Sequence, residues 1–196
     1  MPVKSAMKKI AEHIHKTIEK LDDGEVDLMV EAIEKADKIF LMGVGRSGLV
    51  AKAFAMRLVH LGLTAHVIGE TTSPSISEND LLIAVSGSGA TNSVVKAVEI
   101  AKRMGTKVLA ITSYPESDLG KIADDVVQIE GRTKVDISPN HLKRELAGHE
   151  ELTPLGTLFE DTVLIFSDGI IAKLMSRLGK GEIDMKRRHA KLEWFY

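Results

Sequence analysis

Apolar and polar positions follow two different patterns along the chain. Short, nearly unbroken apolar runs are typical of strands that are buried on both faces of a sheet. Longer stretches place apolar residues at helical spacing. The short runs predict five strands, at residues 38–42, 64–68, 81–85, 107–112 and 126–129. The longer stretches predict helices at 5–20, 25–36, 48–61, 92–104, 119–123 and 157–178, and a charged, helical tail at 183–192.

Two of the predicted helices differ from the rest in their polarity. Residues 48–61 are apolar almost all round, and 157–178 are mostly apolar. A surface helix normally has one broad polar face, so these patterns predict helices that are buried on most sides, in part between subunits. Residues 131–152 are polar and mixed, which predicts a long loop or an inserted short helix.

The order of the elements indicates the fold class. Strands that alternate with helices, and that are apolar throughout, predict a parallel sheet with helices on both faces. We therefore expect an α/β three-layer sandwich with five parallel strands. One domain would span residues 1–196, with a helical lead-in at 1–36 and a C-terminal tail at 183–196. Ligands bind such sheets beyond the carboxyl ends of the strands.

Composition excludes several classes of function. The net charge is −2 with both signs interspersed, so we expect no nucleic-acid partner. The chain has no cysteine, which excludes disulfides, thiolate metal sites and a cysteine nucleophile. No apolar run reaches the length of about 18 residues that spans a membrane. The first ten residues do not resemble a signal peptide, and we expect a cytoplasmic protein.

Two loops rich in glycine and serine follow predicted strands and open predicted helices. The first, Gly43–Gly48, matches the dinucleotide fingerprint G-x-G-x-x-G, with Glu70 about where a ribose-binding acid would lie. The second, Ser86–Thr91, offers glycine amides, hydroxyls and a helix N-terminus, a combination that suits a phosphate group. The alternative is that both loops are ordinary turns, with Thr91 as a helix N-cap.

Both loops, taken together, resemble those of the SIS (sugar isomerase) domain family. That family carries a Gly-x-Gly-x-Ser loop followed by Ser-x-Ser-Gly-x-Thr. The chain is most similar to its 6-phospho-3-hexuloisomerases, because further motifs agree in order and spacing. The motifs are GVGRSG (43–48), FAMRLVHLG (54–62), GETTSP (69–74), SGSG (86–89) and GTLFE (156–160). Residues 131–152 are longer than this pattern suggests.

The resemblance implies a fold, a reaction and a set of site residues. The fold would be the flavodoxin-like SIS sandwich. The reaction would interconvert D-arabino-hex-3-ulose 6-phosphate and fructose 6-phosphate through an enediol, in the ribulose monophosphate pathway, with no metal or redox cofactor. A homotetramer is implied, with a functional link to a hexulose-phosphate synthase. Substrate-binding candidates are Gly45, Arg46, Ser47, Ser86, Gly87, Ser88, Gly89, Ala90 and Thr91. Catalytic candidates are Glu160, His60 and His189.

Each candidate also has a structural interpretation. Glu160 matches the glutamate of the GTLFE motif and would be the general base, yet Thr157–Glu160 also fits a helix capping box. Arg46 would bind a phosphate or sugar oxygen, or else form a surface salt bridge. His60 and His189 would carry protons or polarise the carbonyl, with His189 reaching a neighbouring subunit, or else be structural.

Three other functions remain open at this stage. A different SIS isomerase would act on a pentose or heptose phosphate. A sugar-phosphate sensor domain would bind without catalysis, but no DNA-binding helix pair precedes residue 38. A dinucleotide oxidoreductase would use the first loop and leave the second without a role.

Overall fold

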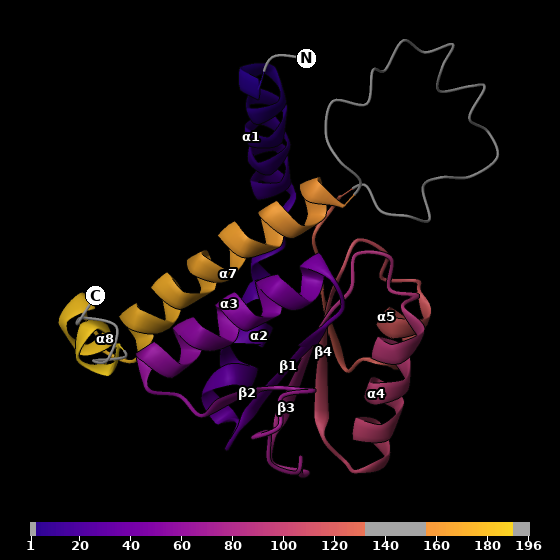
Figure 1. The fold of residues 1–196 in the computed structure, drawn as a ribbon, viewed down its shortest axis with the longest axis vertical. Coiled ribbons are helices and arrows are strands. Elements are labelled where there is room, and N and C mark those ends of the chain that lie inside the picture. The colour runs from indigo at the N-terminus through magenta and orange to yellow at the C-terminus, as the bar shows by residue number, and fades with distance from the viewer. Residues whose placement is uncertain (1–2, 132–155, 190–196) are drawn as a thin grey trace.

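The computed structural model describes residues 3–131 and 156–189 (Figure 1). Its strands are β1 (Ile39–Gly43), β2 (Ala65–Val67), β3 (Leu81–Val85), β4 (Lys107–Thr112) and β5 (Asp125–Gln128). Its helices are α1 (Val3–Lys20), α2 (Asp23–Lys35), α3 (Arg46–Leu61), α4 (Asn92–Arg103), α5 (Asp118–Ile122), α7 (Thr157–Arg177) and α8 (Glu182–Arg188). Every strand and helix predicted in these ranges is present, with ends shifted by a few residues. The loop predicted at 131–152 lies almost wholly outside the described residues.

All five strands are parallel and lie in the order β2-β1-β3-β4-β5. From β1 the chain crosses to the edge of the sheet to form β2, and then returns to the other side of β1 to form β3. The crossovers therefore diverge between β1 and β3. Beyond the carboxyl ends of two such strands the loops separate and leave a crevice, which is where open α/β sheets bind ligands.

Alternate residues of each strand pack on opposite faces of the sheet. Ile39, Leu41 and Ile83 belong to an apolar core that includes residues of α2, α3 and α7. Phe40 and Leu82 belong to a second core with α4 and α5. Helices thus cover both faces of the sheet (Figure 1). The predicted three-layer sandwich with a five-stranded parallel sheet is confirmed.

Helix α3, predicted to be buried on most sides, has an apolar face that is exposed to solvent in the single chain. α3 packs against the sheet and lies beside α7. Leu49, Met56 and Val59 on its other side are exposed. One chain alone therefore does not provide the burial that the sequence of 48–61 predicts. Among the described residues, no helix is both long enough and apolar enough to cross a membrane.

Candidate active site

A cleft of about 300 Å³ opens at the carboxyl ends of β1 and β3. Three segments far apart in the sequence form it: the loop after β1, the loop after β3 and the first turn of α7. Its lining residues are Val44, Gly45, Arg46, Ser47, Val85, Ser86, Gly87, Ser88, Thr91, Gly156, Phe159 and Glu160. Most of the predicted site residues therefore lie in one cleft, at the crevice that the strand order creates.

Glycines allow the loop after β1 to turn tightly into α3. A β-carbon on Gly43 would lie 2.7 Å from the backbone of Ser47, so a side chain there would displace the helix start. Gly45 is the N-cap and has a φ of 62°, a conformation that glycine adopts without strain. As a result the first turn of α3, with the buried Ser47, faces the cleft. Its free amides favour an anion there.

The loop after β3 is a compact turn fixed by its own hydrogen bonds. The Gly89 amide donates to the Ser86 carbonyl oxygen at 3.0 Å. The Ser86 and Thr91 hydroxyl oxygens are 3.1 Å apart and hydrogen-bonded. Thr91 occupies the N-cap position of α4, but its side chain makes no capping hydrogen bond. Thr91 is thus the N-cap residue that the turn interpretation expects, but its hydroxyl bonds within the loop that lines the cleft and not to the amides of α4.

Glu160 points from α7 toward the first loop instead of capping its own helix. α7 begins at Thr157 with Gly156 as the N-cap, so Thr157 lies one position too late to serve as the capping residue. The Ser47 hydroxyl donates to Oε1 of Glu160 at 3.4 Å. The side chain of Glu160 is 13% exposed. The capping-box interpretation is thus wrong, because the glycine before Thr157 takes the cap.

Arg46 lies between two consecutive carboxylates of α7. Its Nη2 donates to Oδ1 of Asp161 at 2.8 Å, and its Nε lies 3.5 Å from Oε2 of Glu160. Adjacent residues on a helix point about 100° apart, so the carboxylates of Glu160 and Asp161 cannot face one site equally well. The long guanidinium side chain spans that difference. It joins the first turns of α3 and α7.

The pKa of Glu160 is raised above its ordinary value. The largest cause is burial, which removes water from the charged carboxylate, and the positive charge of Arg46 offsets this only in part. A carboxylate whose pKa lies closer to neutrality is a better proton acceptor at physiological pH. Glu160 therefore has the environment of a general base, at the wall of a cleft that suits an anion.

His60 and His189 lie together but away from this cleft. Their ring centroids are 4.7 Å apart, and the rings are tilted by 34°. His60 lies near the C-terminal end of α3, whereas Ser47 lies in its first turn. Thirteen residues of helix separate them by about 20 Å. Within one chain, the two histidines therefore do not reach the cleft that holds Glu160.

Two other predictions can be placed in the structure. Glu70, the residue expected to bind ribose in a dinucleotide enzyme, pairs with Lys52 of α3 at 2.5 Å. Ala90 belongs to the Ser86–Thr91 loop, but it is exposed and does not line the cleft. In the two described ranges, no group of three or more His, Asp or Glu side chains is placed to hold a metal ion.

Comparisons with known proteins agree with the motifs. Residues 32–142 match the model of the SIS domain, which is more than half of the chain. An uncharacterized protein of Aeropyrum pernix is 49% identical over 98% of this chain and 93% of its own length. The 3-hexulose-6-phosphate isomerase of Bacillus subtilis is 38% identical over 94% of this chain and 95% of its own length.

A solved structure extends this agreement to three dimensions. The protein MJ1247 of Methanococcus jannaschii superimposes with a TM-score of 0.80 and 35% identity, over 95% of this chain and 98% of that one. Its structure is described as one that infers a function of 3-hexulose-6-phosphate isomerase. The match to the domain model and the similarity to these relatives over nearly the whole chain lead to one conclusion: the chain belongs to the SIS domain family.

Proposed function

We propose that the protein is a 3-hexulose-6-phosphate isomerase, which interconverts D-arabino-hex-3-ulose 6-phosphate and D-fructose 6-phosphate. The observation that carries this proposal is the largely buried Glu160 carboxylate in one cleft with the Ser86–Thr91 loop. The loop suits the phosphate at one end of the sugar, and the carboxylate suits proton transfer at the carbonyl end. The named isomerases among the relatives support the choice of reaction.

Each part of the cleft then has a role in the reaction. Ser86, Ser88 and Thr91, with the amides of the loop, bind the phosphate. Glu160 removes the proton from the carbon beside the carbonyl, and an enediolate forms. Glu160 then returns a proton to the former carbonyl carbon, while a proton moves between the two oxygens. Ser47 and Arg46, at the wall next to Glu160, donate hydrogen bonds to sugar oxygens.

His60 and His189 enter this proposal only through a neighbouring subunit. The pair is remote from the cleft of its own chain, so it would serve the cleft of another copy in the implied homotetramer. There an imidazole would polarise the carbonyl or carry the proton between oxygens. We further propose that the enzyme acts in the cytoplasm, in the ribulose monophosphate pathway, on the product of a hexulose-phosphate synthase.

Proton exchange followed by NMR tests the reaction directly. The protein is incubated with fructose 6-phosphate in heavy water. We expect deuterium at the carbon beside the carbonyl and a new hexulose phosphate signal, because the base exchanges its proton with solvent while the enediolate exists. Binding of the sugar phosphate without exchange would contradict catalysis and favour the sensor domain. Exchange only with pentose or heptose phosphates would keep the enzyme class and change the substrate.

The acid side of the pH profile should reflect the raised pKa of Glu160. The base must be ionised to accept a proton, so kcat/KM should fall as the pH drops through the pKa of Glu160 in the free enzyme. Burial raises that pKa. The fall should therefore occur at a higher pH than for an ordinary glutamate, whose pKa is about 4.3.

Arg46→Met provides the matched comparison for the pH profile. The guanidinium lowers the pKa of Glu160, so its removal should raise that pKa and shift the acid side to higher pH. A shift to lower pH, or no shift, would show that another group controls the profile. Initial rates between about pH 4 and 9, fitted for kcat/KM, give the measurement.

A further inference from the structure

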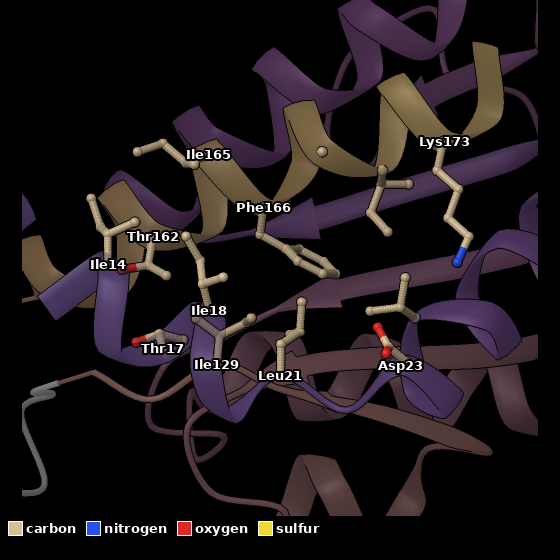
Figure 2. Close-up of a pocket in the computed structure, with 13 residues that line it drawn as sticks. Ile14, Thr17, Ile18, Leu21, Asp23, Ile129, Thr162, Ile165, Phe166 and Lys173 are labelled. Carbon is tan, nitrogen blue, oxygen red and sulfur yellow. The ribbon is translucent and has the colours of Figure 1, made fainter. Parts of the chain in front are cut away.

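The active-site cleft offers an anion little positive charge. Arg46 is the one cationic side chain among the described residues that line it, and Asp161 and Glu160 already pair with it. A groove of about 360 Å³ between α1 and α7 is walled by side chains such as Ile165 and Phe166, and it suits apolar groups better than a phosphate (Figure 2). A phosphate in the cleft must therefore be held mainly by amides and hydroxyls, so the directions of these donors control its affinity.

The end of β4 holds the loop after β3 on the side away from the cleft. We call this loop, Ser86–Thr91, the phosphate loop. The Gly87 carbonyl oxygen accepts from the Ser113 amide at 3.1 Å and from the Thr112 hydroxyl at 3.4 Å. In the strand order, β3 lies between β1 and β4, and the loop after β1 forms the other wall of the cleft. The Gly87 carbonyl group therefore points toward β4, and away from that wall.

This anchored carbonyl group sets the direction of the Ser88 amide. The Gly87 C=O and the Ser88 N–H belong to one trans peptide unit, so they point in opposite directions. With the carbonyl group held against β4, the amide points toward the cleft that Ser88 lines. Within residues 3–131 and 156–189 this amide has no hydrogen-bond partner. It is therefore available to donate to a phosphate oxygen.

The Thr112 hydroxyl lies beneath the phosphate loop and joins it to the turn after β4. Thr112 is fully buried, and its hydroxyl oxygen accepts from the Tyr114 amide at 3.2 Å while the hydroxyl donates to Gly87. The same oxygen lies 3.0 Å from the place of a β-carbon on Gly89. A buried hydroxyl is costly unless it is hydrogen-bonded, and valine would fill nearly the same volume in a buried strand without that need. The hydroxyl thus has a specific role at this position.

On the basis of the proposed function, we propose that Thr112 is a positioning residue for the phosphate of the substrate. Its hydroxyl fixes the Gly87 carbonyl group and the turn that carries the Ser113 amide, and so keeps the Ser88 amide directed into the cleft. Thr112 does not itself line the cleft. The phosphate takes no part in the bond changes, and it is bound alike in the ground state and the transition state. Loss of the hydroxyl should therefore weaken binding and leave turnover unchanged.

Thr112→Val tests this role by a split between binding and turnover. The change keeps the branched shape but removes the hydroxyl. We expect the Kd for fructose 6-phosphate, measured by calorimetric titration, to rise about three- to tenfold. In steady-state kinetics KM should rise by a similar factor, whereas kcat should stay within about twofold of the wild type.

Thr106→Val is the matched control for the loss of a buried hydroxyl. Thr106 precedes the other end of β4, about 20 Å from Thr112, and is 1% exposed. Its hydroxyl donates to the Ser77 carbonyl oxygen at 2.8 Å, remote from the cleft. Thermal unfolding should show a similar loss of stability in both valine variants, but Thr106→Val should leave Kd unchanged. Thr112→Ser keeps the hydroxyl, and its Kd should return to within about twofold of the wild type.

Three results would overturn the positioning role. They are an unchanged Kd for Thr112→Val, an equal rise in Kd for Thr106→Val, and a Kd for Thr112→Ser as weak as that for Thr112→Val. The titration needs no turnover, so a protein that binds fructose 6-phosphate without isomerising it would refute the proposed reaction and still test Thr112. A wild-type protein that does not bind the sugar phosphate would remove the role of the phosphate loop, and that of Thr112 with it.

Discussion

Glu160→Gln should lower kcat by about 10²- to 10⁴-fold and change KM only a few-fold. The amide has nearly the shape of the carboxylate and still fills the wall of the cleft, but it cannot accept the proton of the substrate. Substrate binding relies on the phosphate loop, which the change does not touch. Steady-state kinetics with fructose 6-phosphate, together with a binding titration, separate the two effects.

Asp161→Asn is the matched control for this change. It alters the next carboxylate on the same helix, which contacts Arg46 at 2.8 Å but does not line the cleft. Its effect on kcat should be much smaller. A Glu160→Gln variant with the turnover of the wild type would leave Glu160 without a catalytic role. Equal losses in the two variants would assign the effect to Arg46 and its neighbours instead of to proton transfer.

The fold could be predicted because its signals are local and repeated. The apolar runs at 81–85 and 107–112 are long enough to fill strands that are buried on both faces, and each is followed by helical spacing. A parallel sheet requires such crossovers, so the class followed from the order of elements. The exposure of the apolar face of α3 could not be predicted from the order of elements or from their apolar patterns. Periodicity reveals that a face is apolar, but not whether the same chain covers it.

The loops of the site were predictable for a related reason. Glycine and serine after a buried strand mark the ends of strands, and the sheet topology brings two such ends together. The contacts of single side chains were less accessible. Gly156 caps α7 and frees Glu160 for the cleft, whereas the sequence alone fits a capping box equally well. Arg46 joins Asp161 and Glu160 because of its length, which no spacing rule describes.

The contact between His60 and His189 could not be predicted from the sequence either. His60 and His189 are far apart in the sequence, and their rings meet only because α8 returns beside the end of α3 (Figure 1). Spacing along one chain predicts neighbours on one helix or at one edge of a sheet. It does not predict that His60 and His189 meet about 20 Å from Ser47 and the cleft. From that position the pair could act only on the cleft of another copy.

Gly89→Ala should disrupt the phosphate loop, because the added methyl group would collide with Ser117. Gly89 has a φ of 60°, and a β-carbon on it would lie 1.8 Å from the Ser117 hydroxyl oxygen and 2.5 Å from the Ser117 β-carbon. The loop is also tied to α5, because the Leu119 amide donates to the Gly89 carbonyl oxygen at 3.0 Å. Either the loop or Ser117 must therefore move to accept the methyl group. We expect KM to rise at least about tenfold, and the free energy of unfolding to fall by about 2–4 kcal/mol.

Gly179→Ala separates backbone strain from the collision. Gly179 has a φ of 61°, and no atom lies within 4 Å of its would-be β-carbon. It lies beyond the end of α7, far from the cleft. Its replacement should lower the free energy of unfolding by only about 1 kcal/mol and leave KM unchanged. The difference between the two variants then measures what the contact with Ser117 contributes.

A second substitution tests whether the loop itself binds the phosphate. Ser117→Gly removes both atoms that the methyl group would strike, so the double variant Gly89→Ala/Ser117→Gly should recover part of the lost affinity. The double variant should not recover its free energy of unfolding. The alanine at position 89 remains in a strained backbone conformation, and the loss of the Ser117 side chain removes the cap of α5. If Gly89→Ala lowers stability but leaves KM as in the wild type, the loop moves without affecting the substrate, and the phosphate must bind elsewhere in the cleft. Recovery of KM without recovery of stability would instead tie the position of this one turn to substrate affinity.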